Sequence, residues 1–308
     1  MKEDESTRFT NYLLTKGYSS GTIERYTLDV LRFEKWTIKE NIPLESVSYN
    51  DVLLYIQYNK KTLTQASVGH LVNSVKHYFN YLIFAEKIQD NPTDQIQIKG
   101  IRRRKLYDIL SKQELENLFH NYQLKEDKTK ENFNWYQLSR LTYKRNKIML
   151  GLLVFQGLTA TELNRLKVVD VKLREGKIFI AGTRRSNERE MNLESHQMLD
   201  MMEYILKTRA EFQNYIQKQN DFLFNSNGVS NNLNNTLTKL MQKLKAQDIK
   251  LSSIKQIRTS VITTWLKQYN LRQVQHMAGH RYVSSTESYQ INDVEGLLED
   301  IEKFHPIG

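Results

Sequence analysis

The stretch LSSIKQIRTSVITTWLKQYNLRQVQHMAGHRYVSSTESY, residues 251–289, carries the strongest structural signal in the chain. Apolar residues recur there at helical spacing behind Ser252 or Ser253, and either serine can cap a helix. The pattern therefore predicts a helix on which Lys255 and Arg258 stand one turn apart on an exposed side. A basic pair in that position can hold an anion.

Two shorter helical patterns follow in the same stretch. The first is expected to end at Gly279, a residue typical of helix C-termini, which leaves His280 on the following loop. Ser284 and Glu287 then have the spacing of a capping box. Tyr289 is therefore expected in a new helical turn, nine residues beyond His280.

Each of these polar residues also has an ordinary structural interpretation. Tyr289 is one of 17 tyrosines, and a half-buried tyrosine that only packs is common. His280 can simply belong to the turn after the helix, and Arg258 can be a surface charge. Their joint order and spacing favour a functional role.

The composition suits a globular protein with a polyanionic partner. With 308 residues and 39% hydrophobic content, the chain is long enough for two domains with cores of their own. Lys and Arg number 45 against 35 for Asp and Glu, which gives a net charge of +10. That excess favours nucleic acid as a partner, although many basic proteins are simply soluble.

Several classes of protein are disfavoured by what the sequence contains. There is no cysteine, so a disulfide framework, a thiolate zinc site and a cysteine nucleophile are excluded. The start MKEDESTRF is charged, and no apolar run approaches the length of a membrane span, so we expect a cytoplasmic protein without membrane contact. Only 3 prolines and 12 glycines favour a mainly helical chain.

The N-terminal part, from Thr7 to about Ile88, has helical periodicity throughout and predicts four or five short helices. One ends at Gly17, and the next begins at Ser19 or Ser20. A mixture of basic and aromatic residues follows, in which Lys76 is a candidate DNA contact; a solvated helix face is the alternative for any single member.

A change of character at residues 93–107 marks a domain boundary. The run Arg102, Arg103, Arg104 and Lys105 is typical of a tether that lies against DNA phosphates, or else of a basic surface loop. We therefore predict a helical domain over residues 1–92, a basic linker over 93–107 and a second domain over 108–308.

The second domain opens with a capping box at Ser111 and Glu114. Apolar residues then predict a central buried helix over Tyr143–Phe155, and residues 177–181 and 188–193 predict a β-hairpin. A short helix is expected to start at Glu162 and Leu163. Further helices are predicted by apolar periodicity at residues 196–215 and 231–244, and in a C-terminal tail at 294–304.

The order Lys255, Arg258, Gly279-His280 and Tyr289 closely resembles the C-terminal half of the tyrosine recombinase, or phage integrase, family. That family has His or Lys, two residues, Arg, then Gly-His and a nucleophilic Tyr at the same spacing. The stretch GYSSGTIERYTLDVLRFEKW, residues 17–36, resembles the start of the family's DNA-gripping core-binding domain.

The resemblance implies a fold and an activity. The fold is mainly α with a small β-hairpin or sheet: an N-terminal helical bundle that binds DNA, and an α+β catalytic domain. The activity is site-specific DNA recombination or integration through a 3'-phosphotyrosine, on double-stranded DNA and as a homotetramer, without a cofactor, a metal ion or a small-molecule substrate. The tail helix would dock on a neighbouring protomer, or else on its own domain.

Two family cations are missing or replaced. The family pattern Gly-Leu-Arg-x-x-Glu-Leu has Thr159 in place of its first catalytic arginine. On the hairpin, the expected lysine falls at Thr183 or at Arg184, with Arg185 as the next candidate and also a candidate DNA contact. Small Thr159 leaves room in which Arg165, or one of the two hairpin arginines, can reach a phosphate.

These residue types suit attack on a phosphodiester, whose transition state gathers negative charge that fixed cations must offset. Arg258 offers a planar fork for two oxygens, Lys255 and His280 add charge or hydrogen bonds, and Tyr289 is the nucleophile. The sequence therefore predicts a recombinase with an altered set of cations. The alternative is a cleavage-deficient relative that binds DNA as an accessory or regulatory factor.

Overall fold

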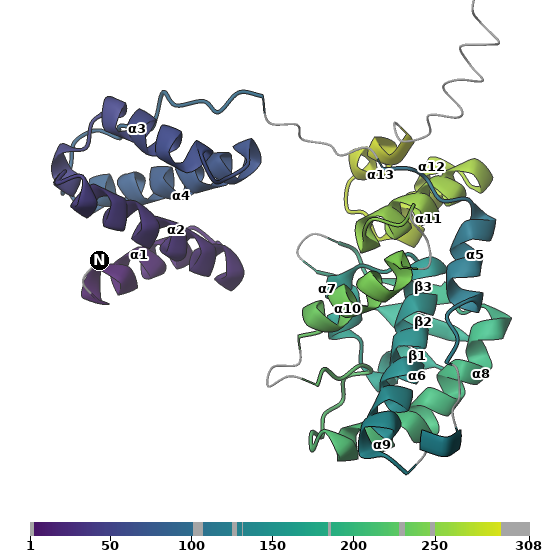
Figure 1. Cartoon of the computed structure of the whole chain (residues 1–308). Coiled ribbons are helices and arrows are strands. Elements are labelled where there is room, and N and C mark those ends of the chain that lie inside the picture. Colours follow the sequence, from purple (N-terminus) through teal and green to yellow (C-terminus); the bar gives the residue numbers. More distant parts are fainter. Residues whose placement is uncertain are drawn as a thin grey trace, which may run out of the picture. The chain divides into compact units, whose positions relative to one another are not determined.

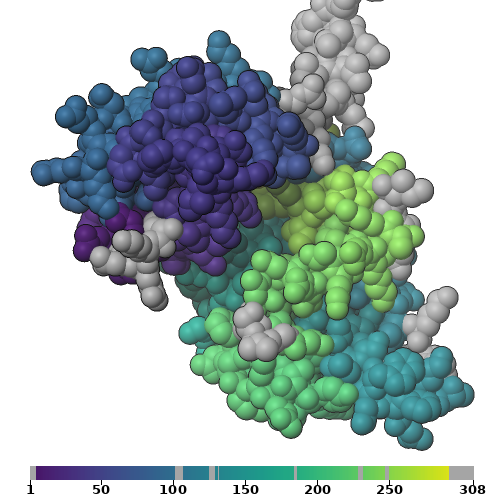
Figure 2. All heavy atoms as spheres, turned by 60° about the vertical axis from the view of Figure 1, so that its left-hand side comes forward, coloured from purple at the N-terminus to yellow at the C-terminus, as the bar shows by residue number. Residues whose placement is uncertain are grey.

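The computed structural model describes residues 3–100, 107–124, 128–130, 132–183, 186–227, 232–246 and 250–290. The chain divides into two compact units, Met1–Lys105 and Leu106–Gly308 (Figure 1). Figure 2 shows one face of the molecule with all heavy atoms drawn as spheres. The basic run Arg102–Lys105, the hairpin residues Arg184 and Arg185, and the predicted tail helix lie outside the described residues.

The N-terminal unit is built from helices. They are α1 (Glu3–Thr15), α2 (Ser20–Lys39), α3 (Tyr49–Lys60) and α4 (Gln65–Phe84), with a 3-10 turn, η1, at Leu44–Ser46. As predicted, α1 ends just before Gly17 and α2 follows Ser19. Ser48 and Thr64 cap α3 and α4 by accepting backbone N–H groups. Two of these helices have 20 residues each, so they are not all short.

The core of this unit lies mainly between α2 and α4. Phe33 packs edge-on against Tyr55 and Phe79, with ring centroids 4.9 and 5.7 Å away. Two acids of α2 are also buried, and each accepts a hydrogen bond from α4: Ser74 donates to Asp29 at 2.9 Å, and Tyr78 donates to Glu34 at 2.8 Å. These bonds offset the cost of burying the acids and fix α2 relative to α4.

The C-terminal unit is a helical domain with one small sheet. Its helices are α5 (Lys112–His120), α6 (Asn134–Val154), α7 (Ala160–Arg165), α8 (Ser195–Glu203), α9 (Arg209–Tyr215), α10 (Asn234–Lys245), α11 (Ile254–Gln268), α12 (Leu271–Ala278) and α13 (Val283–Gln290). A π-helical turn, Tyr204–Thr208, joins α8 to α9, so the predicted helix 196–215 is continuous but not regular. The 3-10 turns η2 and η3 cover Lys128–Lys130 and Val168–Asp170.

The sheet has three antiparallel strands in the order β1 (Val171–Lys172), β2 (Lys177–Ile180) and β3 (Arg189–Asn192). Ile178 pairs with Met191 and Ile180 with Arg189, which confirms the predicted hairpin. The alternate residues Ile178 and Ile180 are buried, as the period of two requires. Strand β1 has only two residues, too few for a recognisable alternation.

Helix α6 occupies the centre of this unit. Its last turns, from Ile148 to Val154, are buried on every side, because α5, α8, α9 and α11 all pack against it. The predicted capping box at Ser111 and Glu114 is present at the start of α5. The expectation of a mainly α chain with a small sheet and two parts is therefore confirmed.

Two local predictions were wrong. Arg258 does not stand on an exposed side of its helix, because α5, α6, α12 and α13 surround α11 and leave the residue only 9% exposed. Helix α13 begins at Val283, so Ser284 is its second residue and not its cap.

None of the described helices is both long and apolar enough to cross a membrane.

Candidate active site

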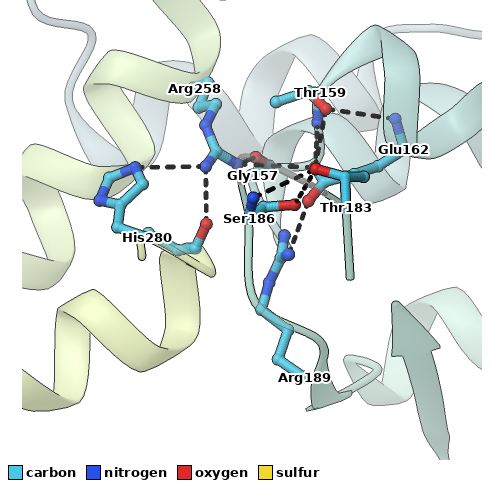
Figure 3. A network of polar contacts seen from close by, with 9 residues as sticks. Gly157, Thr159, Glu162, Thr183, Ser186, Arg189, Arg258 and His280 are labelled. Atoms are coloured by element: carbon cyan, nitrogen blue, oxygen red, sulfur yellow. Dashed lines mark hydrogen bonds and ion pairs between the residues drawn. The ribbon is translucent and has the colours of Figure 1, made fainter. Parts of the chain in front are cut away.

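Helix α11 carries Arg258 into the interior of the C-terminal unit. Ser253 fixes the start of this helix by accepting the N–H of Gln256. The Arg258 guanidinium donates to the carbonyl oxygens of Gly157 and, at 2.7 Å, of Ala278. Arg258 therefore joins the loop after α6 to the end of α12 (Figure 3).

The imidazole of His280 lies beside this guanidinium. Gly279 ends α12 in the left-handed region, with φ of 67°, and so turns the chain toward the site. The Nε2 atom of His280 lies 3.4 Å from Nη2 of Arg258, and its Nδ1 atom lies 2.9 Å from the Thr286 hydroxyl. Because a guanidinium can only donate, Nε2 is the acceptor and Nδ1 carries the proton.

His280 is a neutral group in this environment. Burial lowers the pKa of His280 to about 4, and the positive charges of Arg258 and Arg189 act in the same direction. The imidazole is therefore uncharged near pH 7, so it offers hydrogen bonds and no positive charge. The sequence left both roles open.

Tyr289, on α13, completes the group. Its ring stacks on the His280 ring, with centroids 5.5 Å apart and planes at 16°. Burial lowers the pKa of Arg258, while the nearby Glu162 carboxylate and the Tyr289 phenol oppose that shift. Arg258, His280 and Tyr289, which the sequence singled out, thus meet from α11, from the loop after α12 and from α13.

Two further residues of the site are Thr159 and Glu162. Thr159 is the N-cap of α7: its hydroxyl accepts the N–H of Glu162, and its own N–H and hydroxyl donate to Glu162 Oε2 at 2.8 and 2.9 Å. The sequence-based prediction missed this contact, which the Thr-x-x-Glu spacing of a capping box could have indicated. Glu162 Oε2 also lies 3.8 Å from Nη1 of Arg258.

Arg189 is a buried cation that no sequence pattern singled out. It begins β3, and its Nη1 atom donates to Glu162 Oε1 at 2.6 Å. Burial raises the pKa of Glu162, but the hydrogen bond and charge of Arg189 outweigh this and leave that pKa below its ordinary value. The acid therefore stays ionised between two arginines.

The turn of the β-hairpin packs on the loop that carries His280. Asn187 donates its N–H to the carbonyl of Gly279 at 2.9 Å, and Ser186 forms an isolated β-bridge with His280. Thr183 and Ser186 close the turn through backbone and hydroxyl hydrogen bonds. The predicted hairpin position is thus close to the site, while Arg184 and Arg185 themselves lie outside the described residues.

The other predicted contacts are more remote. Lys255 is exposed on α11, one turn before Arg258, and within the described ranges no hydrogen bond or ion pair joins its ammonium to the site. Lys76, on α4 of the other unit, pairs with Asp94 at 3.0 Å. The described residues contain no group of three or more His, Cys, Asp or Glu that could hold a metal ion.

Comparison with known families agrees with this geometry. The model of the phage integrase family matches residues 109–295. The chain belongs to the phage integrase family. The model of the phage integrase N-terminal SAM-like domain matches residues 7–86. The chain is therefore a tyrosine-type site-specific recombinase that acts on DNA.

Individual relatives are distant but cover nearly the whole integrase chain. Tyrosine recombinase XerD of Shewanella oneidensis is 26% identical over 299 residues, which is 96% of this chain and 93% of that protein. The XerH recombinase bound to palindromic difH substrate has a TM-score of 0.67 at 20% identity, over 90% of this chain and 78% of that one. A lambda integrase dimer bound to a COC' core site has a TM-score of 0.62 at 13% identity, covering 94% and 95%.

Proposed function

We propose that this recombinase cleaves DNA by attack of the Tyr289 hydroxyl on a backbone phosphate beside Arg258. The observation that carries the proposal is the convergence of three side chains from three elements. The Tyr289 ring stacks on His280, Arg258 contacts His280, and the Tyr289 phenol lies near enough to Arg258 to affect its pKa. A tyrosine that only packs needs no buried guanidinium next to it.

The step conserves bond energy and needs no nucleotide cofactor. The Tyr289 oxygen forms a bond to phosphorus while the bond from phosphorus to the 5' oxygen breaks, which gives a 3'-phosphotyrosine and a free 5' hydroxyl. The phenol proton passes to solvent or to a nearby base as the attack proceeds. Reversal by another 5' hydroxyl then joins a new pair of strands.

Arg258 is the principal charge at the phosphate. Its guanidinium lies near Tyr289, and its positive charge can stabilise the non-bridging oxygens of the transition state. His280 assists as a neutral hydrogen-bonding group because its pKa is about 4. Lys255 is the proposed proton donor to the leaving oxygen, with water as the alternative, because Arg184 at the hairpin position holds its proton too firmly.

The grip on DNA comes from a separate set of cations. We assign this role to Lys76, Arg185 and the run Arg102, Arg103, Arg104 and Lys105. The side chain of Lys76 is 40% exposed in its ion pair with Asp94. Its ammonium can therefore leave the Asp94 carboxylate for a DNA phosphate without moving a charge into the protein interior. Two protomers on one core site, as in the lambda integrase complex, support a homotetramer on two duplexes.

Thr159 favours a second candidate function. It stands where the family has its first catalytic arginine, and an uncharged cap in that place lowers the stabilisation of the transition state. Loss of one such donor typically slows a reaction by about a hundredfold to a thousandfold. A chain that binds DNA and does not cleave it would then act as an accessory factor.

A nicked suicide duplex separates the two functions, because its short 5' fragment diffuses away after cleavage and leaves the covalent adduct trapped. The native chain is expected to form an adduct that migrates with the protein in denaturing gels, and Tyr289→Phe is expected to bind the same duplex without forming it. Thr159→Arg should raise the rate of adduct formation. Binding by the native chain without any adduct would support the accessory function instead.

A further inference from the structure

The site contains a second arginine, Arg189, which has no role in the family pattern described above or in the proposed chemistry. Arg189 begins β3, and its side chain is 0% exposed, so it touches neither solvent nor DNA directly. Its partner Glu162 has a side chain only 5% exposed. A fully buried ion pair adds little stability by itself, because removing both charges from water costs as much as their attraction returns.

Glu162 connects this cation to the phosphate-binding arginine. One carboxylate oxygen, Oε1, accepts from Arg189 at 2.6 Å, and the other, Oε2, lies 3.8 Å from Nη1 of Arg258. Thr159 holds Oε2 with two hydrogen bonds at 2.8 and 2.9 Å. The Glu162 carboxylate therefore has a fixed orientation, and its two oxygens face the two arginines (Figure 3).

Arg189 also lies directly against the backbone before His280. A Cβ atom placed on Gly279 would come 2.5 Å from Nη1 and 3.2 Å from Cζ of Arg189. Its guanidinium thus supports the loop that presents His280 to Arg258 and Tyr289. The same loop is held from the other side by the hairpin, through the bond from Asn187 to Gly279.

The Arg189 guanidinium does not use all of its hydrogen-bond donors, as an arginine that served only the fold would be expected to do. Its Nε and Nη2 atoms are buried and have no hydrogen-bond partner within the described part of the chain. Buried N–H groups left without an acceptor reduce stability, so a residue kept only for the fold would ordinarily be completed or replaced by an apolar one. Arg145 is equally buried in the same unit, and its guanidinium does find acceptors: it donates to Asn225, Asn227 and Asn146.

We propose that Arg189 is a positioning residue for strand cleavage. Through Glu162 it holds the Arg258 guanidinium where the phosphate arrives, and through Gly279 it supports the loop of His280. This role deepens the proposed function and rests on it.

The kinetic test compares Arg189→Met and Arg189→Lys with Arg145→Met and Arg145→Lys in the full chain. Adduct formation with the suicide duplex is followed in a single turnover at saturating protein, beside DNA affinity and thermal unfolding. Arg189→Met should slow adduct formation about a hundredfold, Arg189→Lys should recover part of that loss, and DNA affinity should change little. The Arg145 variants should lose stability without slowing adduct formation by the folded protein.

A second readout does not depend on cleavage. In Arg189→Met the His280 imidazole, followed by NMR of labelled histidine, should titrate closer to the ordinary histidine value, because a neighbouring positive charge has gone; Arg189→Lys and Arg145→Met should leave it low. If the native chain forms no adduct, the proposed function fails, while this titration still tests the position of Arg189. Equal rates in the Arg189 and Arg145 variants, or an unchanged His280 titration in Arg189→Met, would overturn the assignment.

Discussion

The Nε2 atom of His280 accepts a hydrogen bond from Nη2 of Arg258, 3.4 Å away, so the imidazole meets the guanidinium as an acceptor. A protonated imidazole has no acceptor to offer and would repel Arg258. Burial and this contact therefore act together, and the result is an arginine charge beside a neutral histidine at the proposed phosphate site. Arrival of a phosphate is expected to reverse the balance and raise the pKa of His280.

The first prediction concerns the titration of His280. Its pKa is about 4 in the folded chain, against an ordinary value of 6.5. The unfolded chain therefore takes up this proton first as pH falls, and the stability that neutral His280 contributes is complete above pH 6.5 and lost between pH 6.5 and about 4. The imidazole signals of His280 should not move between pH 8 and pH 6, whereas a midpoint near 6.5 would contradict the described contacts.

The second prediction concerns Thr159 as the cap of α7. Thr159→Ala removes a hydroxyl that binds both the Glu162 N–H and the Glu162 carboxylate. The free energy of unfolding of the C-terminal unit should fall by about 1 kcal/mol in urea denaturation. Thr159→Ser keeps the hydroxyl and is the matched control. Equal stability of the alanine and serine variants would show that this cap is not formed.

The third prediction separates two effects at Gly279. Alanine there must adopt φ near 67° and also meets the Arg189 guanidinium at 2.5 Å. Gly176→Ala is the control, since its φ is 64° and its added Cβ meets only the Met198 sulfur at 4.0 Å. The control should lose about 1 kcal/mol of stability from the backbone alone, and Gly279→Ala should lose more and also slow adduct formation. If the two variants lose the same stability and form adduct at the same rate, the contact between Gly279 and Arg189 is not present.

The fourth prediction concerns the salt dependence of DNA binding. Replacing Arg102, Arg103, Arg104 and Lys105 by glutamine should reduce the slope of log affinity against log salt by about one for each phosphate that the variant no longer binds. As a control, glutamine replaces four lysines that already pair with carboxylates: Lys112, Lys144, Lys172 and Lys177. If the slope falls equally in both quadruple variants, the basic run has no special role.

Much of this fold follows from local sequence signals. The periodicity behind Ser253, the end of α12 at Gly279 and the capping box at Ser111 each depend on residues close together in the chain, and all three were predicted. The start of α13 was not, because Ser284 and Glu287 have capping spacing in a helix that has already begun at Val283. The capping spacing of four residues alone does not indicate whether the helix has already begun before them.

The site was harder to predict because its contacts join distant segments. Arg258, His280 and Tyr289 were found through a spacing pattern, but the burial of Arg258 depends on α5, α6, α12 and α13 closing around α11. The pair between Glu162 and Arg189 spans 27 positions, and neither residue has a local pattern that indicates the other. Only the tertiary fold brings those charges together.

Cleavage by this site requires that the oxygen of Tyr289 becomes bonded to a DNA phosphate. The most direct measurement is mass spectrometry of the protein after reaction with the suicide duplex, nuclease digestion and proteolysis. We expect a nucleotide on the peptide that contains Tyr289, and none in Tyr289→Phe or in native protein incubated with an intact duplex of unrelated sequence. A nucleotide on a different residue, or no covalent product under conditions where the native chain is saturated with DNA, would contradict the proposed mechanism.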